Sequence, residues 1–290
     1  MRPRPVWLAF FAAVAAYQST ILTRCRPSHT RRRELHVATE QLYSPTPPLT
    51  PDRVGDWAVA PVRSTWNGVT LSPLVVSDDP SVDGLHSVAH PSHPHYRAMN
   101  NLRDPHGALG VWPAAYAATA QLAKRRDAPR VLELGAGAGL PSLYASLVLR
   151  SPRVVATDVE AVPLRFLRAA RAAHAPAASP EAFDTKIVDV CAAAEDDLAG
   201  FDVVVAADML YDREVAASLG SLLGAAVAGG DGPDLVVCDP GRRGRDDFLD
   251  AFAAASGFLD ARFVERSVPE HCTDVFDGSR CPAVGVLLYA

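Results

Sequence analysis

Lysine is nearly missing from this sequence of 290 residues, which contains only Lys124 and Lys186. Arginine therefore supplies almost all of the positive charge, and the formal net charge at pH 7 is −5. A protein with this balance has no broad basic field, so we expect no nucleic-acid partner held through its phosphates.

Cysteine is also sparse and lacks the spacings that are typical of metal sites. The five cysteines are Cys25, Cys191, Cys238, Cys272 and Cys281. They form no C-x-x-C pair and no even set, so we expect reduced thiols and neither a disulfide framework nor a zinc site.

Histidines cluster at positions 86, 90, 93, 95 and 106. Pro91 and Pro94 interrupt the helix or strand geometry that usually presents metal ligands, and no cysteine or aspartate joins the cluster. Exposed loop histidines are expected there, and we predict no metal.

Residues 1–33 contain seven arginines and no acid, together with an apolar run over 6–17. An arginine-rich, acid-free start is typical of an organelle transit peptide, while arginines followed by a short apolar run are typical of a secretory signal peptide. A membrane anchor would need roughly 20 apolar residues, and Gln18 interrupts this run. We predict that residues 1–40 are a targeting segment, with no stable membrane insertion after processing.

Beyond this segment the sequence changes character twice. Residues 41–106 are rich in Pro, Ser, Asp and His and predict an N-terminal extension or linker, with strand candidates over 68–76 that could pair a hairpin onto the main domain. From 107 to 290 helical and strand patterns alternate, which indicates one α/β domain with a doubly wound parallel sheet. The expected strands are 130–134, 153–157, 185–190, 201–208, 234–239, 261–268 and 283–290, and the expected helices are 113–125, 140–149, 161–175, 213–227 and about 245–255.

Alternating glycines follow the first of these strands, in the stretch Glu133, Gly135, Gly137, Gly139. Glycines after a strand allow the backbone to approach a ligand closely and to point N–H groups at it. A dinucleotide fingerprint would need a further glycine where the chain has Leu140. The pattern E-x-G-x-G-x-G resembles motif I of S-adenosylmethionine-dependent methyltransferases, although a structural turn or an unusual dehydrogenase site is an alternative.

Acids at the ends of the next two strands fit an adenosine-bearing cofactor. Asp158 is placed to accept hydrogen bonds from both ribose hydroxyls, or alternatively to cap the helix that follows. Asp189 and Val190, at the expected end of the third strand, are candidates to contact the adenine.

The fourth strand ends in Asp208 and Tyr211, a D-x-x-Y element that follows the apolar run 203–207. This element resembles the acid-x-x-Tyr motif of the seven-β-strand protein-lysine methyltransferases, and the resemblance covers about residues 107–289. Trp112 matches the family's tryptophan beside the cofactor, and CDPGR at 238–242 is most similar to the lysine methyltransferases of the electron-transfer-flavoprotein β subunit.

The resemblance implies a Rossmann-like seven-stranded sheet, mostly parallel with an antiparallel C-terminal strand, and S-adenosyl-L-methionine as the cofactor. It implies transfer of a methyl group to a lysine of a protein, with Asp208 and Tyr211 as catalytic residues. Because the flavoprotein subunit is mitochondrial, it favours that compartment, with the plastid or the secretory route as alternatives. Small-molecule N-methylation, for example of a nicotinamide-like ring, is the alternative reaction, and a non-catalytic cofactor-binding scaffold is the alternative class.

Lysine methylation makes a specific demand on such a site. An ammonium has no lone pair, and its reference pKa near 10.4 makes deprotonation at pH 7.5 cost about 4 kcal/mol. Desolvation lowers that pKa, and the neutral nitrogen must then be aligned with the methyl group. Asp208 and the Tyr211 hydroxyl could steer the nitrogen without acting as strong bases, although Tyr211 could instead only pack under the end of the sheet.

Overall fold

The computed structural model describes residues 53–55, 57–77, 106–174, 182–272 and 280–289. The predicted targeting segment 1–40 lies outside these ranges, as do the histidines at 86, 90, 93 and 95. The chain separates into Met1–Pro45 and Thr46–Ala290, and every described residue belongs to the second unit. Among the described helices, none is both long and apolar enough to cross a membrane.

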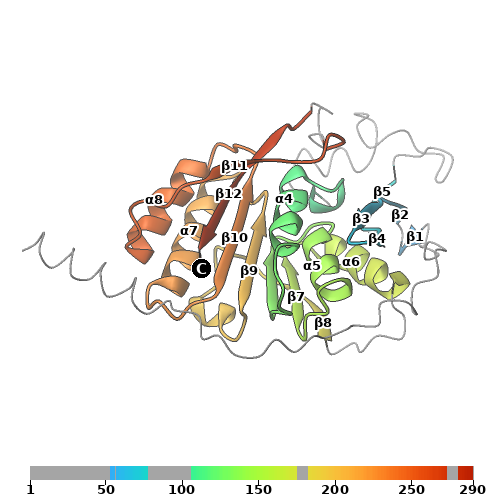
Figure 1. Ribbon diagram of the computed structural model, residues 1–290, viewed down its shortest axis with the longest axis horizontal. Helices are drawn as coiled ribbons and strands as arrows, with labels where there is room; N and C mark the ends of the chain where they lie inside the picture. The colour runs from blue at the N-terminus through green and yellow to red at the C-terminus, as the bar shows by residue number, and fades with distance from the viewer. Residues whose placement is uncertain (1–52, 56, 78–105, 175–181, 273–279, 290) are drawn as a thin grey trace, which may run out of the picture. The chain divides into compact units, whose positions relative to one another are not determined.

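One seven-stranded sheet organises this unit, in the order β11-β12-β10-β9-β6-β7-β8 (Figure 1). Its strands are β6 (Val131–Leu134), β7 (Val154–Asp158), β8 (Phe183–Ile187), β9 (Val203–Ala207), β10 (Asp234–Asp239), β11 (Val264–Ser267) and β12 (Ala283–Tyr289). Neighbours from β8 to β10 run parallel, whereas β12 is antiparallel to both β10 and β11. The predicted Rossmann-like sheet with an antiparallel C-terminal strand is therefore confirmed.

The direction of winding reverses between β6 and β9. From β6 the chain proceeds outward to β7 and β8, and it then returns to place β9 and β10 on the other side of β6. A reversal of this kind opens a crevice beyond the carboxyl ends of the two central strands, where α/β proteins bind their ligands. The fold thus directs attention to the segments that follow β6, β7 and β9.

Helices cover both faces of the sheet. They are α4 (Pro113–Leu122), α5 (Leu140–Leu147), α6 (Ala161–His174), α7 (Arg213–Val227) and α8 (Arg245–Ser256), with the 3-10 turns η1 (His106–Ala108) and η3 (Glu195–Leu198). Alternate residues of each central strand enter separate cores: Val203 and Val205 pack with α4, α5 and α6, whereas Val204 packs with α7 and α8. Because both faces are buried, these strands read as continuous apolar runs in the sequence.

The helix boundaries follow from local chemistry. Asp212 precedes α7, and its carboxylate accepts the backbone N–H groups of Glu214 and Val215. Gly257 ends α8 in the left-handed conformation, at φ 79°. The predicted helices match the observed ones to within three residues at each end.

The third strand was predicted less well. The pattern indicated residues 185–190, but β8 runs from Phe183 to Ile187, so Asp189 and Val190 lie beyond its end. This strand is at the edge of the sheet and only Thr185 on it is buried, so its sequence lacks the apolar run of a central strand. The apolar residues that suggested a later end belong instead to the turn that follows, where Val190 enters the core.

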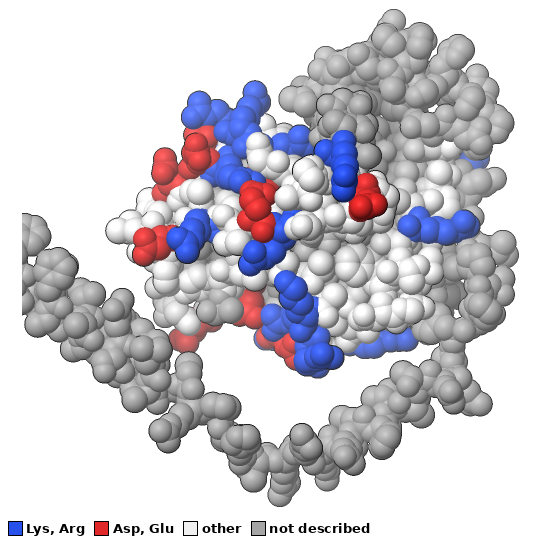
Figure 2. Space-filling model, turned by 45° about the horizontal axis from the view of Figure 1, so that its top comes forward, with Lys and Arg blue, Asp and Glu red and all other residues white. Residues whose placement is uncertain are grey.

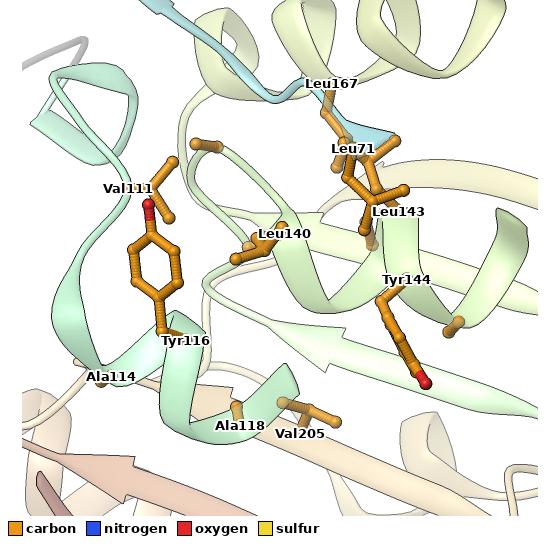
Figure 3. Close-up of a cluster of buried hydrophobic side chains, with 14 of the residues drawn as sticks. Leu71, Val111, Ala114, Tyr116, Ala118, Leu140, Leu143, Tyr144, Leu167 and Val205 are labelled. Carbon is orange, nitrogen blue, oxygen red and sulfur yellow. The ribbon is translucent and has the colours of Figure 1, made fainter. Parts of the chain in front are cut away.

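Five short strands precede the domain and are β1 (Arg53–Val54), β2 (Trp57–Pro61), β3 (Ser64–Trp66), β4 (Val69–Leu71) and β5 (Leu74–Val76). They form two small sheets, β1-β2-β5 and β3-β4, and their apolar side chains pack against α5 and α6 of the main domain. Asn67 and Gly68 make the two-residue turn between β3 and β4, both with positive φ. Figure 3 shows Leu71 of β4 beside Leu143 of α5 and Leu167 of α6.

Basic and acidic side chains lie next to one another over much of the described surface in Figure 2. Ion pairs among the described residues include Arg130 with Asp202 and Arg213 with Asp247. Exposed pairs of this kind contribute little to stability. The described part of this face therefore shows mixed charge and no continuous basic field.

Candidate cofactor and substrate site

The glycine turn after β6 has the conformation that its sequence predicts. Gly135, Gly137 and Gly139 have φ values of 61°, 51° and 69°, a region that residues with a side chain rarely adopt. A Cβ atom on Gly137 would lie 2.6 Å from the carbonyl oxygen of Gly107, and one on Gly135 would lie 1.8 Å from Sδ of Met209. The turn therefore needs glycine both for its backbone and for the close approach of its neighbours.

Asp158 connects the end of β7 to this turn. Its Oδ2 accepts the backbone N–H of Gly137 at 2.9 Å, and its Oδ1 accepts that of Glu160 at 3.0 Å. Glu160 directly precedes α6, so Asp158 contacts both the glycine turn and the start of this helix. Burial is the main cause that raises the pKa of Asp158 above its ordinary value, and the nearby Glu160 raises it further.

Glu133 lies under the turn. Its carboxyl group is 1% exposed and accepts both the backbone N–H and the hydroxyl of Ser142, in the first turn of α5. Burial raises its pKa to about 8, although the hydrogen bonds from Ser142 oppose this shift. Glu133 thus supports the glycine turn from within, and its predicted contact with the cofactor stays a prediction.

Asp189 and Val190 occupy different surroundings although they are adjacent. Asp189 is exposed, and its Oδ1 accepts the backbone N–H of Cys191 at 2.9 Å. Val190 is buried in the core on the side of α7 and α8. The segment leading to them is tied to the crevice because Val188 donates its N–H to the carbonyl oxygen of Asp158 at 3.0 Å.

The D-x-x-Y element turns sharply after β9. Asp208 adopts a left-handed backbone with φ 60°, which aspartate tolerates better than most residues. Its N–H is held by the carbonyl oxygen of Cys238 at 2.9 Å, and the next residue, Met209, packs its sulfur against Gly135. The end of β9 is therefore in direct contact with the glycine turn.

Tyr211 lies on the same side as the other candidates. It is 38% exposed, and burial of part of its ring is the main cause that raises the pKa of its hydroxyl. The charges of Asp158, Asp212, Cys191 and Asp208 raise this pKa further. Asp158 ends β7 and Asp208 directly follows β9, so the acids at both strand ends contribute to the raised pKa of Tyr211.

Arg242 is the residue of this site that sequence reasoning missed. Its guanidinium donates two hydrogen bonds to Asp208, from Nε to Oδ1 at 2.7 Å and from Nη2 to Oδ2 at 3.1 Å. The same group lies 5.5 Å from the centre of the Trp112 ring. In the sequence, CDPGR spans the expected end of the strand over 234–239, and the position of Arg242 just beyond that end is the signal that could have placed it near the crevice.

Gly107 is a second contact that the sequence did not reveal. It belongs to η1, and a Cβ atom on it would lie 3.0 Å from the Cα of Gly137 and 3.4 Å from Oδ2 of Asp158. The segment before α4 therefore lies against the glycine turn. Trp112 follows on the same segment. The candidate residues thus come from this segment and from the ends of β6, β7, β9 and β10.

These surroundings suit a nucleoside cofactor with an amino-acid tail. The left-handed glycines let backbone atoms approach a ligand, and a buried carboxylate at the end of β7 can accept hydrogen bonds from hydroxyl groups. Within the described ranges, no group of three or more His, Cys, Asp or Glu is placed to hold a metal ion. The geometry is thus consistent with an organic cofactor.

Comparison with known proteins identifies the family. A family model described as lysine methyltransferase matches residues 95–254, which is more than half of the chain. No curated protein matches the sequence. Among solved structures, SMU.776, a candidate methyltransferase complexed with S-adenosylhomocysteine, has a TM-score of 0.50 and 12% identity, and the match covers 79% of this chain and 56% of that one.

A second solved structure matches with a lower TM-score. It is a TehB-like S-adenosylmethionine-dependent methyltransferase from Corynebacterium glutamicum, with a TM-score of 0.39 and 15% identity over 67% of this chain and 92% of that one. At such identities the structural matches concern the fold alone, and the family assignment rests on the sequence match. The chain belongs to the lysine methyltransferase family, and its cofactor is S-adenosylmethionine.

Proposed function

We propose that this protein methylates a lysine side chain of another protein. The observation that carries the proposal is the contact between the D-x-x-Y element and the glycine turn: Met209 packs its sulfur against Gly135, and Gly137 of the same turn donates its N–H to Asp158. The candidate residue for the ribose and the candidate residues for the substrate nitrogen therefore share one crevice. A site that only bound the cofactor would not need a tyrosine and a buried acid at the point where the methyl group is expected.

Each residue of the chain has a role in this proposal. The glycine turn and Asp158 would bind the cofactor, with Glu133 holding the turn through Ser142. Asp189 and Val190 would lie toward the adenine, and Trp112 would lie beside the cofactor. Bound S-adenosylmethionine supplies a methyl group on a positively charged sulfur.

Asp208 and Tyr211 would orient the incoming nitrogen. Deprotonating a lysine at pH 7.5 costs about 4 kcal/mol, and burial beside Tyr211 would reduce that cost by disfavouring the ammonium. The neutral amine still has N–H groups, which the Asp208 carboxylate and the Tyr211 oxygen can accept. Orientation of this kind can contribute roughly 7 to 11 kcal/mol to lowering a barrier.

Two finer proposals concern the substrate and the compartment. The CDPGR and DMLYD stretches support the β subunit of the electron-transfer flavoprotein as the substrate. The acid-free, arginine-rich residues 1–33 support import into mitochondria. A fluorescent fusion of the whole chain tests the second proposal, and a secreted or cytosolic pattern would contradict it.

A labelling experiment tests the reaction. The protein is incubated with methyl-labelled S-adenosylmethionine and a total-cell extract, and proteins are then separated from small molecules and hydrolysed in acid. We expect label in methyl-lysine, and Tyr211→Phe should reduce it. Tyr144→Phe is the control and should not reduce it, because the Tyr144 hydroxyl accepts a hydrogen bond from Asn67 and has no role in the proposed site. Label confined to small molecules would refute the proposal. Since the enzyme itself has only two lysines, self-labelling contributes little background.

A further inference from the structure

Asp208 and Arg242 form an ion pair that fixes both oxygens of the carboxylate. The side chain of Asp208 is 5% exposed and that of Arg242 is 24% exposed, so water screens the pair only weakly. Two parallel N–H to oxygen bonds, at 2.7 and 3.1 Å, set the plane of the carboxylate as well as its distance. The predicted nitrogen-binding acid therefore has a fixed orientation and a balanced charge before any substrate arrives.

Arg242 is itself held on several sides. Its backbone N–H donates to Oδ2 of Asp239 at 3.0 Å, and Asp239, which has no exposed surface, also receives Nε of Arg245 at 2.7 Å. The Arg242 guanidinium lies over the Trp112 ring. The arginine is therefore preorganised by the turn after β10, and it has little freedom to leave Asp208 for another partner.

The loop that carries Arg242 is joined to the D-x-x-Y loop at two further points. Gly244 donates its N–H to the carbonyl oxygen of Leu210 at 3.0 Å, and Nε of Arg243 donates to that of Tyr211 at 2.9 Å. Neither contact uses the Arg242 side chain. A substitution of Arg242 therefore removes its ion pair with Asp208, while the two hydrogen bonds between the loops remain.

The charge of this pair matters for a lysine substrate. A buried carboxylate without a cation would bind a lysine as an ammonium and would stabilise that charged form, which cannot attack a methyl group. A carboxylate that shares its charge with a guanidinium still has lone pairs for an N–H donor, because each oxygen accepts more than one hydrogen bond. The pair thus offers an acceptor without offering a full negative charge.

We propose that Arg242 is a positioning residue that acts through Asp208: it orients the carboxylate and cancels its charge, so that the site binds the lysine as a neutral amine. This inference rests on the proposed function. It predicts that removing the arginine charge weakens turnover and leaves substrate binding intact, because a carboxylate no longer neutralised by Arg242 attracts the ammonium and disfavours the reactive neutral amine.

The test compares Arg242→Gln with Arg242→Lys, using methyl-labelled S-adenosylmethionine and a serial dilution of total-cell extract, with label counted as methyl-lysine. We expect Arg242→Gln to lower kcat by roughly 10- to 100-fold with an apparent KM that is unchanged or lower. Arg242→Lys keeps the charge but loses the two parallel hydrogen bonds, so its kcat should lie between those of the wild type and Arg242→Gln. Arg213→Gln is the matched control, since Arg213 pairs with Asp247 outside this site, and it should leave kcat unchanged.

A double-mutant cycle shows whether Arg242 acts through Asp208. If it does, Asp208→Asn combined with Arg242→Gln should be no less active than Asp208→Asn alone. Calorimetry with S-adenosylhomocysteine should give the same affinity for wild type and Arg242→Gln. Three outcomes would overturn this inference without affecting the proposed function. They are additive losses in the cycle, a raised KM with unchanged kcat for Arg242→Gln, and weaker S-adenosylhomocysteine binding by Arg242→Gln. A wild type that labels no lysine would overturn the proposed function and this inference with it.

Discussion

Gly137 donates its backbone N–H to Oδ2 of Asp158 across 2.9 Å, so the end of β7 and the middle of the glycine turn are hydrogen-bonded to each other. The acid that is expected to bind the ribose therefore also shapes the turn that is expected to bind the rest of the cofactor. A change at either residue should affect both.

Replacing Asp158 with alanine should weaken S-adenosylhomocysteine binding by about 30- to 1,000-fold, which corresponds to about 2 to 4 kcal/mol for the loss of two hydrogen bonds to a charged group. Titration calorimetry measures this affinity. Asp184→Ala is the control, because Asp184 lies on the edge strand β8, where its Oδ1 accepts the N–H of the neighbouring Thr185. Tight NAD binding, with no S-adenosylhomocysteine signal in the wild type, would contradict the assignment of the cofactor.

Asp208→Asn and Tyr211→Phe should each retain cofactor affinity within a few fold and lower turnover by roughly 10- to 1,000-fold. The physical reason is the loss of one acceptor or one oriented dipole at the reacting nitrogen. Calorimetry and the methyl-lysine assay measure the two quantities on the same samples. Full methyl transfer by Tyr211→Phe would show that the phenol only packs, and loss of cofactor binding by Asp208→Asn would place Asp208 in the cofactor site.

Gly137→Ala should destabilise the protein by about 1 to 3 kcal/mol and weaken cofactor binding, because the residue has φ 51° and its Cβ would meet the Gly107 backbone oxygen at 2.6 Å. Gly230→Ala is a matched control, since Gly230 also has positive φ but has no atom within 4 Å of the added Cβ. Thermal unfolding and calorimetry of both variants separate the effect of backbone strain from that of the clash with Gly107. Equal effects of the two substitutions would mean that the contact with Gly107 has no energetic weight.

The buried Glu133 should make stability depend on pH. The folded protein retains its proton up to about pH 8, whereas the unfolded chain releases it near 4.5, so the unfolded state binds fewer protons between those values. The contribution of this group to the free energy of unfolding should therefore fall as pH rises through that window. Glu133→Gln keeps the shape of the side chain but removes its titratable proton. The melting temperature of this variant, minus that of the wild type, should therefore increase between about pH 5 and about pH 9. A difference that stays constant with pH would contradict this account.

Much of the fold could be predicted because its central strands are buried on both faces. The run Val203–Ala207 has no polar residue to obscure the pattern, and helices that cover the sheet begin and end at recognisable residues such as Asp212 and Gly257. The edge strand β8 was placed too late because one buried residue, Thr185, gives no periodicity to follow. The glycine turn was predictable because left-handed backbone requires glycine there.

The pairing of Asp208 with Arg242 could not be predicted in the same way. The two residues are 34 positions apart, and their contact depends on how the turn after β10 is bent by Asp239. Sequence reasoning identified Asp208 from its strand and assigned it to the substrate nitrogen, but it had no means of locating a cation beside it. Contacts between strand ends arise from the order of strands in the sheet, and side-chain patterns along one strand do not encode that order.

The small strands that precede the domain determine how far the chain can be shortened. Leu71 and Leu74 have no exposed surface, and Trp57 packs edge-on against Phe166 of α6 at 6.3 Å between ring centres. A fragment that began at residue 107, or at residue 95 where the family match starts, would leave these apolar surfaces of α5 and α6 open to solvent and prone to self-association. A fragment that keeps these contacts must therefore include Trp57, Leu71 and Leu74, which lie upstream of the residues that the family model matches.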